Sequence, residues 1–507
     1  MMTGLQNGAI SLPELLVEFT LEAPAPAVDI MNVSSNSKDV TPGTLFIALS
    51  GINSKGIDYA IDAVNAGAIA VLFDADDPYS RERIPLLQKQ ISTHWIGVSG
   101  LIRANGFIVS RFFGEPAKTM TIVGVTGTDG KSSVTHLLVQ ALTRLGKSSA
   151  SIGTLGYGVG NQLSPGSLTT PDAVTLQSRL HQFSQQRCEY VVMEVSSHAL
   201  QQYRVNGCNF DIAVLTNLGR DHLDYHGDLE SYAEAKARLF KDFDLSARIV
   251  NADDDFGRRL AADSEADSLF RYSISGSEQN ANEVSLISIE QSANGQNIRA
   301  RTPVGDVTAV TGLIGHFNVL NTLACIATLV ALGFNRDQLE TAIKDLKPIP
   351  GRMEMFSAGS DQAVAVVDFA HTEQALRACL EACRGHTSGE LWCVFGCGGD
   401  RDPGKRAGMG RAVEELADHA IVTDDNPRHE SPEKIVAGVL LGMQDPDRAS
   451  VVHNRKAAIE YALSEAAAGD MVVITGKGHE PDQIVGDERR PFSDRYIVGQ
   501  ILGVSHD

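Results

Sequence analysis

Short runs of apolar, largely β-branched residues recur along the 507-residue chain, and segments with helical spacing separate them. This alternation is typical of parallel sheets covered by helices. In residues 1–115 it predicts a small α/β domain, with strands at 44–49, 68–73 and 95–98 and a helix near 59–66.

The middle of the chain continues the pattern and predicts a second α/β domain with a parallel sheet. Each strand there ends in polar residues, which in parallel sheets gather at the edge where ligands bind. Residues 283–312 alternate like hairpins instead, so we expect an antiparallel insertion at the edge of this sheet. The parallel strands are predicted at 120–125, 189–195, 212–216 and 247–251.

The last part of the chain repeats the alternation as a separate unit. A chain of this length exceeds what one hydrophobic core supports, and its length favours about three domains. We therefore expect domains at 1–115, 116–350 and 351–507, with 114–118 as a linker. Strands in the last domain are predicted at 364–368, 391–395, 419–423, 450–452 and 471–475.

The most distinctive stretch is 121–133, where a β-branched run leads into a glycine-rich turn, a lysine and two hydroxyl residues. Glycines let backbone N–H groups and the N-terminus of the next helix point at an anion. Lys131 would neutralise phosphate charge, and a hydroxyl at Ser132 or Ser133 would bind Mg²⁺. A plain tight turn is the alternative, but it requires no lysine followed by hydroxyls. The sequence thus predicts a P-loop for a nucleoside triphosphate.

Two later strand ends carry residues that bind metals. Glu194 ends the strand after the P-loop, where a triphosphate site needs a second metal ligand, although it could instead cap the following helix. The turn 217–226 holds two aspartates and two histidines within six residues, a density that suits metal or phosphate, although such turns are often plain exposed loops. Lys236 lies one helical turn from Tyr232 and Phe240, so we expect it to face partly inward.

Four polar segments of the last domain each follow a predicted strand and should therefore line one edge of its sheet. Their arginines, lysines and acids suit a substrate that carries both carboxylates and amines, because arginine grips carboxylate and acidic groups grip ammonium. Ordinary polar loops explain one such segment well and four together poorly. The segments are 367–372, 396–406, 423–428 and 476–480.

The composition of the chain excludes several classes of binding partner. The net charge of −20 argues against binding to nucleic acid or to an anionic membrane surface. The seven cysteines form no Cys-x-x-Cys pair, so we interpret them as reduced core residues. The longest apolar helix pattern, at 323–334, is too short to span a bilayer, and the N-terminus lacks the pattern of a signal peptide. We expect a cytoplasmic monomer.

Taken together, these motifs resemble those of the Mur ligases of peptidoglycan synthesis, and the likeness extends over nearly the whole chain. Within that family they look like the ligases that add the third peptide residue, and Asp-Asn-Pro-Arg at 425–428 resembles the motif of those that add meso-diaminopimelate. The other similar segments are Gly-Thr-x-Gly-Lys at 127–131, Glu-Val-Ser-Ser-His at 194–198, His-Leu-Asp-Tyr-His-Gly at 222–227, Gly-Arg-Met-Glu at 351–354 and Gly-Lys-Gly-His-Glu at 476–480.

The resemblance implies a fold of three α/β domains: a small N-terminal domain for a UDP-linked substrate, a central P-loop domain with a parallel sheet that binds ATP, and a Rossmann-like C-terminal domain for an amino acid. It also implies catalytic roles for Lys131, Glu194, His222 and Lys236, and Mg²⁺ ligation by Ser132, Glu194, His222 and Lys236. Lys236 matches a family lysine that CO₂ carbamylates, which turns a cation into an anionic metal ligand.

The same resemblance assigns binding residues. For ATP they are Gly127, Thr128, Asp129, Gly130, Lys131, Ser132, Ser133, Asn318 and Arg352. For UDP-N-acetylmuramoyl-L-alanyl-D-glutamate they are Ser37, Thr169, Thr170, Ser196, Gln202 and Arg204. For meso-diaminopimelate they are Arg401, Asp425, Asn426, Arg428, Gly476 and Glu480. Asp129 departs from the asparagine usual in the family, and Phe369 replaces a common tyrosine.

The implied reaction is ATP-driven amide formation. The D-glutamyl γ-carboxylate would be phosphorylated to an acyl phosphate, which the amine of diaminopimelate then attacks. Three alternatives remain: a ligase that adds L-lysine at the same step, an enzyme like folylpolyglutamate synthase, and a nucleotide-binding scaffold without catalysis. The presence of all four predicted catalytic residues argues against the scaffold.

Overall fold

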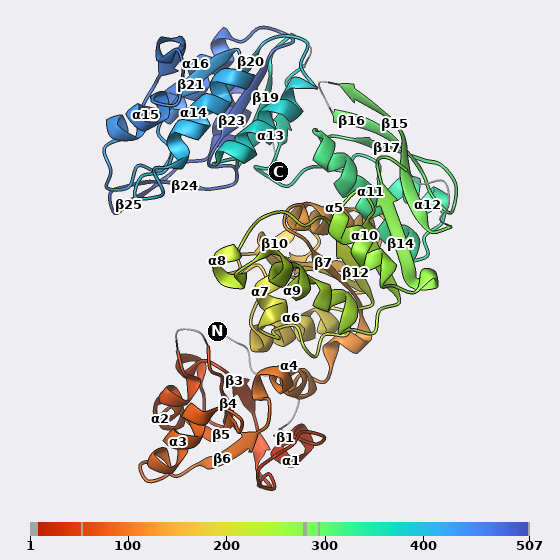
Figure 1. The fold of residues 1–507 in the computed structure, drawn as a ribbon, viewed down its shortest axis with the longest axis vertical. Helices are drawn as coiled ribbons and strands as arrows, with labels where there is room; N and C mark the ends of the chain where they lie inside the picture. The colour runs from red at the N-terminus through yellow and green to blue at the C-terminus, as the bar shows by residue number, and fades with distance from the viewer. Residues whose placement is uncertain (1–8, 52–53, 277–280, 293–294, 360, 505–507) are drawn as a thin grey trace. The chain divides into compact units, whose positions relative to one another are not determined.

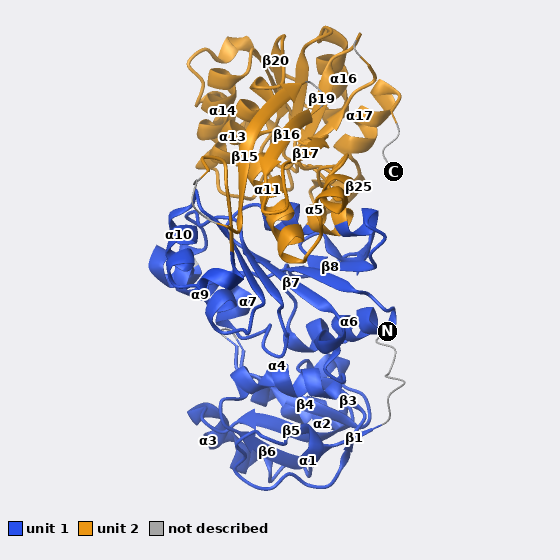
Figure 2. Ribbon diagram, turned by 90° about the vertical axis from the view of Figure 1, so that its right-hand side faces the viewer, with its two compact units in different colours: residues 1–135, 142–269 blue, residues 136–141, 270–507 orange. Residues whose placement is uncertain are grey.

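The computed structural model of the chain describes residues 9–504 except 52–53, 277–280, 293–294 and 360. The expectation about a signal peptide concerns residues 1–8, which lie outside the described residues. The chain divides into two compact units, one of residues 1–135 and 142–269 and one of residues 136–141 and 270–507 (Figure 2). This division does not test the three predicted domains, whose boundaries stay a prediction.

The first unit begins with a small parallel sheet of order β3-β4-β5-β6. Every residue of β4 is buried, as its uninterrupted apolar sequence predicts. All three predicted strands of this region are present, and the predicted helix near 59–66 is observed as α2. The elements are β1 (Ile10–Ser11), α1 (Leu12–Leu15), β2 (Asp29–Ile30), β3 (Asn32–Ser34), β4 (Thr44–Ala48), α2 (Ala60–Asn65), β5 (Ala68–Asp74), α3 (Pro78–Leu87), β6 (His94–Val98) and α4 (Leu101–Phe112).

The larger sheet of the first unit has the order β10-β9-β8-β11-β7-β12-β13. From β8 to β13 its neighbours are parallel, and Val125 of β7 lies opposite Glu194 of β11. The polar strand ends therefore share one edge, as predicted. The elements are β7 (Thr121–Thr126), α5 (Lys131–Arg144), β8 (Ser149–Gly153), β9 (Gly156–Val159), β10 (Gln162–Ser164), α6 (Ala173–Gln185), β11 (Tyr190–Glu194), α7 (Ser197–Gln201), β12 (Ile212–Leu215), α8 (Leu223–His226), α9 (Leu229–Lys241), β13 (Ala247–Asn251) and α10 (Asp255–Ala262).

The second unit opens with β14, which pairs with β15 in parallel, and antiparallel strands follow. β15, β16 and β17 pair in sequence order at the end of the strand order, which confirms the predicted hairpins at a sheet edge. The helix α11 that follows is almost wholly buried, as its apolar pattern predicts. The elements are β14 (Leu269–Ser273), β15 (Glu283–Ser292), β16 (Gly295–Arg301), β17 (Val307–Thr311), α11 (His316–Ala331) and α12 (Arg336–Ala342).

The C-terminal sheet has the order β18-β19-β23-β20-β21-β22, and only β18 is antiparallel to its neighbour. Its strands β19, β20, β21 and β23 are labelled in Figure 1. Its side chains alternate between two cores, one against α13, α14 and α15 and one against α16 and α17. All five predicted strands are present. The elements are β18 (Glu354–Phe356), β19 (Val364–Asp368), α13 (Glu373–Arg384), β20 (Leu391–Phe395), α14 (Lys405–Leu416), β21 (His419–Val422), α15 (Pro432–Leu440), β22 (Ala449–Val451), α16 (Arg455–Glu465), β23 (Met471–Thr475), β24 (Asp482–Val485), β25 (Glu488–Pro491) and α17 (Asp494–Leu502).

Capping side chains mark several helix starts in the sequence. Ser196, Asp228 and Asn335 each accept a backbone N–H from the first turn of α7, α9 and α12. The cap of α7 is thus Ser196, so Glu194 does not have the capping role considered as an alternative. All seven cysteines are free and buried, as predicted. Within the described residues, no helix has both the length and the apolar character needed to cross a membrane.

Candidate active site

The predicted P-loop joins the end of β7 to the start of α5, and residues 126–132 form what we call the phosphate cradle. Gly127 has a φ of +151°, and a Cβ there would lie 1.8 Å from the hydroxyl of Thr216, so only glycine fits. The backbone N–H groups of Thr128 and Asp129 donate to the backbone and side-chain oxygens of Asn217, at 2.9 and 3.0 Å. The following strand end therefore holds the cradle in shape.

Two lysines donate to one carbonyl of this loop. Lys131 Nζ lies 3.0 Å and Lys236 Nζ 2.6 Å from the oxygen of Gly127, and Lys131 also donates to Thr128. Lys236, on α9, is only 1% exposed, more deeply buried than the sequence indicated. Burial, together with the charge of Lys131, lowers the pKa of Lys236 to about 6. Its amine is therefore largely neutral at pH 7.

Glu194 projects into the same place from the end of β11. Its Oε1 accepts from the hydroxyl of Ser132 at 2.8 Å and from the backbone N–H of Thr154 at 2.8 Å, while Oε2 accepts from the Thr154 hydroxyl at 3.2 Å. Burial raises the pKa of Glu194, and these hydrogen bonds and the charge of Lys131 oppose that rise. A buried carboxylate beside a hydroxyl offers the oxygen ligands that Mg²⁺ prefers.

His222 lies on the neighbouring turn in a left-handed conformation, with a φ of +53°. Its ring packs 4.8 Å from the ring of His198, and its Nε2 lies 3.3 Å from Asp221. Within the described residues, no group of three or more His, Cys, Asp or Glu side chains is arranged to hold a metal ion. The structure thus brings Ser132 and Glu194 together, whereas His222 instead joins a histidine cluster.

The remaining residues predicted to bind ATP differ in their exposure and contacts. The side chain of Asp129 is exposed, and its backbone oxygen accepts from Thr216 at 2.6 Å. In the second unit, the amide of Asn318 in α11 is buried and donates to the backbone oxygen of Ile314, just ahead of the helix, at 2.8 Å. Arg352 is exposed and stacks 4.5 Å from the ring of Phe369, so the phenylalanine found in place of tyrosine still supports it.

The predicted substrate residues of the first unit form a hydrogen-bonded chain at the edge that bears Glu194. The hydroxyl of Thr170 donates to the backbone of Glu194 and accepts from the N–H of Ser196. Arg204 donates to Thr170 and to Gln202, which in turn donates to Tyr225. Thr169 hydrogen-bonds Thr154, and Ser37 lies apart, half-buried in a 3₁₀ turn after β3.

In the second unit, the loops after β21 and β23 form what we call the C-terminal site, made of Asp425, Asn426, Arg428, Lys477 and Glu480. Lys477 is fully buried and donates to Asn426 Oδ1 at 3.2 Å, to Glu480 Oε2 at 3.0 Å and to the backbone of Asp482 at 2.5 Å. Asn426 Nδ2 also donates to Glu480 Oε2, at 3.0 Å.

Arg428 is held at the rim of this site with a φ of +51°, and its Nη1 donates to the oxygen of Gly399 at 2.8 Å. Its backbone pairs with the hairpin of β24 and β25. A Cβ at Gly476 would lie 2.5 Å from Asp425, so glycine is needed there for close approach. Burial raises the pKa of Asp425, and the nearby charges of Arg455 and Lys477 oppose that rise. Arg401 is exposed on the adjacent loop.

Two sequence interpretations change in this region. Arg406, included among groups suited to a substrate carboxylate, instead forms a two-point ion pair with Glu430 at 2.8 and 2.6 Å. Lys477 lies inside the motif at 476–480, but its spacing there does not predict a role in the site. Arg455 and Asp494 form a fully buried ion pair, and Arg455 also donates to the backbone of Thr475. Sequence spacing does not predict this pair, because both residues lie in ordinary helical patterns.

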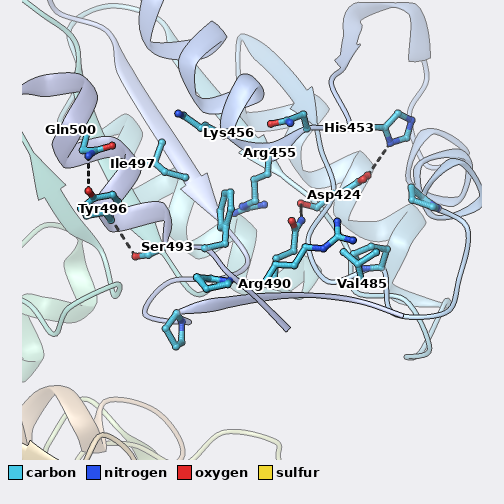
Figure 3. Close-up of a pocket in the computed structure, with 17 residues that line it drawn as sticks. Asp424, His453, Arg455, Lys456, Val485, Arg490, Ser493, Tyr496, Ile497 and Gln500 are labelled. Carbon is cyan, nitrogen blue, oxygen red and sulfur yellow. Dashed lines mark hydrogen bonds and ion pairs between the residues drawn. The ribbon is translucent and has the colours of Figure 1, made fainter. Parts of the chain in front are cut away.

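A cavity of about 740 Å³ borders the same loop. Figure 3 shows His453 paired with Asp424 and Tyr496 bonded to Ser493 and Gln500 among its lining residues. The residues of the C-terminal site are not among those that line it.

Comparison with known proteins shows which family the chain is similar to. Sequence profiles match at 29–94 (Mur ligase family, catalytic domain), 125–329 (Mur ligase middle domain) and 351–478 (Mur ligase, glutamate ligase domain). The UDP-N-acetylmuramoyl-L-alanyl-D-glutamate–2,6-diaminopimelate ligases of Alkalilimnicola ehrlichii and Pseudomonas putida are each 44% identical, over 92% of this chain and 94% and 93% of theirs.

Solved structures agree. A structure of UDP-N-acetylmuramoyl-L-alanyl-D-glutamate–2,6-diaminopimelate ligase is 34% identical, with a TM-score of 0.76, and covers 98% of this chain and 99% of that one. A Mycobacterium tuberculosis folylpolyglutamate synthase complexed with ADP and AMPPCP, 20% identical with a TM-score of 0.58 over 78% of this chain and 95% of that one, shares the fold alone.

The P-loop, the buried carboxylate beside it and these matches define an α/β ligase that uses ATP. The chain belongs to the Mur ligase family.

Proposed function

We propose that this chain joins meso-2,6-diaminopimelate to the D-glutamyl γ-carboxylate of UDP-N-acetylmuramoyl-L-alanyl-D-glutamate, an ATP-driven step of peptidoglycan precursor synthesis. The observation that carries the proposal is the C-terminal site, in which the Asp-Asn-Pro-Arg motif meets Glu480 and which lies in a chain 44% identical to ligases named for this reaction. An arginine fork suits the distal carboxylate that diaminopimelate has and lysine lacks.

ATP would bind with its phosphates at the cradle. Lys131, which now donates to loop carbonyls, would turn to the phosphate oxygens, and the N–H groups at the start of α5 would add positive potential. These groups offset the charge on the oxygens during transfer to the glutamyl carboxylate, which yields ADP and an acyl phosphate.

The residues present fit a magnesium ion. Ser132 and Glu194 offer oxygen ligands 2.8 Å apart, and a carbamylated Lys236 would add a third. His222 packs against His198 in the structure, so it would join the set only after its ring turns away from that partner. Mg²⁺, when bound, would neutralise phosphate charge.

Lys236 has the property that carbamylation requires. A neutral amine adds to CO₂ and loses one proton, which leaves an anionic carbamate on Nζ. The lowered pKa of Lys236 keeps its amine neutral at pH 7, and the nearby Lys131 would pair with the new anion.

In the second half-reaction, a neutral amine of diaminopimelate attacks the acyl carbon, the amide forms and inorganic phosphate leaves. Glu480 would hold an ammonium of the amino acid and Arg428 a carboxylate, which fixes the attacking amine in place. Orientation of this kind can lower the activation barrier by roughly 7 kcal/mol or more in the best cases.

The direct test is an assay of the purified protein with ATP, the UDP-linked dipeptide and either amino acid, read as tripeptide product and phosphate. We expect turnover with meso-diaminopimelate to exceed that with L-lysine by at least about 100-fold, because lysine lacks the carboxylate that would pair with Arg428. Faster turnover with lysine would overturn the proposal. Phosphate release that no substrate stimulates would favour the inactive scaffold.

A further inference from the structure

The orientation of the Asn426 side chain is determined by its neighbours. Lys477 Nζ and the backbone N–H of Ile484 both lie within hydrogen-bond distance of Asn426 Oδ1, at 3.2 and 2.9 Å, and both groups can only donate. The oxygen must therefore face them, and Nδ2 must face Glu480, to which it donates at 3.0 Å. A flipped amide would place donors against donors.

The same neighbours orient Glu480. Asn426 Nδ2 and Lys477 Nζ both donate to Oε2 of this carboxylate, so Oε1 remains as the atom that can accept from a ligand. Burial raises the pKa of Glu480, but the hydrogen bonds from Asn426 and Lys477 and the charge of Lys477 outweigh it, so the pKa lies below its ordinary value. The carboxylate is therefore anionic at neutral pH.

Lys477 itself makes no contact that a substrate could share. Its side chain is fully buried, and its three ammonium hydrogens have three acceptors: Asn426, Glu480 and the backbone oxygen of Asp482. A buried cation is stable only with such complete pairing. Its effect on a ligand must therefore pass through Asn426 and Glu480.

We propose that Lys477 is a positioning residue that sets the polarity of the C-terminal site. It fixes Nδ2 of Asn426 beside Glu480 and takes up Oε2 of Glu480, so that the second N–H of Asn426 and the anionic Oε1 of Glu480 stand side by side. That pair matches the amino-and-carboxylate end of an amino acid. This inference rests on the proposed function, because its test measures the KM of the ligase reaction for the amino acid.

The charges of the site agree with this role. Arg428, Arg455 and Lys477 carry three positive charges, and Asp425, Glu480 and Asp494 carry three negative ones when ionised, so the charges balance. The amino-and-carboxylate end of an amino acid carries one charge of each sign and keeps that balance. The buried pair of Arg455 and Asp494 supports the loop from behind, since Arg455 also donates to the oxygen of Thr475 at 2.7 Å.

The test compares the KM values of Lys477→Met with those of the wild-type protein. The substitution keeps the approximate length of the side chain and removes the ammonium group. We expect KM for the amino acid to rise about 10- to 100-fold, the size of lost hydrogen bonds to a charged group, with KM for ATP and for the UDP-linked dipeptide within about twofold. Lys456→Met, an exposed lysine of the same unit, is the matched control and should change nothing. An unchanged KM for the amino acid, or an equal rise in all three, would overturn the proposal.

A second comparison covers the case in which Lys477→Met does not fold because Glu480 is left unpaired. Removing both charges in Lys477→Met/Glu480→Gln avoids that cost. Because Lys477 is proposed to act through Asn426 as well as Glu480, adding Lys477→Met to an Asn426→Ala/Glu480→Gln variant should leave its KM unchanged; a further rise would contradict the proposal. All values are measured with whichever amino acid the wild-type protein joins, so a failure of the diaminopimelate assignment is seen first in the wild type and separately from the result for Lys477.

Discussion

The phosphate cradle and the C-terminal site use buried lysine in opposite ways. In the cradle, Lys131 and Lys236 both donate to one backbone carbonyl, and the charge of Lys131 disfavours a charge on Lys236. In the C-terminal site, Lys477 is matched by a carboxylate, an amide oxygen and a carbonyl. The first arrangement gains from an added anion, whereas the second is already complete. The comparison indicates that the cradle is completed by an anionic ligand that pairs with its lysine. In the C-terminal site, by contrast, the lysine is already paired and serves to orient the groups that contact the ligand.

The largest expected effect comes from removing the charge that meets the phosphates. Lys131→Ala should lower kcat by about 100-fold or more, because a preorganised charge at the transferring group contributes at least that much. Phosphate release in the complete assay measures it. Lys118→Ala, an exposed lysine ahead of β7, serves as the control. An active Lys131→Ala protein would remove the cradle from catalysis.

Loss of the second cradle lysine should be nearly as severe but reversible. Lys236→Ala should lose most activity because no carbamate can form, and short carboxylic acids added to the assay should restore part of it. Lys241→Ala, exposed on the same helix, should behave as wild type. Wild-type activity of Lys236→Ala would rule out the carbamate.

Because Lys236 is buried, we also expect the free energy of unfolding to depend on pH. Its pKa of about 6 in the folded state is below its ordinary value of 10.5, so between these values the unfolded chain binds the extra proton and stability rises with pH. Below about pH 6 the full cost of burying the lysine is present. In CO₂-free buffer, Lys236→Met should therefore raise the melting temperature, by an amount that shrinks from pH 6 to pH 10. A difference that does not depend on pH would contradict the lowered pKa.

In the C-terminal site, Arg428→Lys tests the fit for a carboxylate. It should raise KM for meso-diaminopimelate about 10- to 100-fold and leave KM for ATP unchanged, because lysine cannot reproduce the fork of arginine. Steady-state kinetics with Arg490→Lys, exposed in the adjacent hairpin, provide the comparison. If KM for diaminopimelate does not move, Arg428 does not read the distal carboxylate.

The smallest effect concerns Asp129, an exposed acid beside the cradle. Its charge opposes the lowering of pKa in both Lys131 and Lys236, and it would repel phosphates. Asp129→Asn should lower KM for ATP by about two- to fivefold at low salt, and less at high salt, where exposed charges are screened. Asp255→Asn, 93% exposed, should leave it unchanged. A rise in KM would mean that Asp129 helps to bind the nucleotide.

The sequence predicted the strands well because apolar β-branched runs buried on both faces of a sheet have few alternatives. The strand at 471–475 is predicted from an uninterrupted apolar run, and the structure buries it between the two cores on either side of the sheet. The hairpins at 283–312 were equally clear from their period of two. Boundaries shifted by about a residue, as at 212–215, where polar residues follow a strand without a sharp turn signal.

The site was less predictable where a role depends on pairing. Periodicity placed Lys236 partly inward, but it could not show that Gly127 would receive two ammonium groups. Nor could the sequence pattern show that Arg406 is neutralised by Glu430 and Arg428 is not. In the sequence, both arginines stand in polar segments that follow a predicted strand. Side-chain partners from distant segments decide these roles, and sequence spacing does not report them.

Crystal structures with a non-hydrolysable ATP analogue and with meso-diaminopimelate would test the contrast between the two sites most directly. With the nucleotide bound, Lys131 Nζ should leave the carbonyls of Gly127 and Thr128 for phosphate oxygens. With the amino acid bound, Lys477 should keep all three of its acceptors while Glu480 Oε1 meets an ammonium. A Lys131 that stays on its loop, or a Lys477 that exchanges partners for the substrate, would contradict the account.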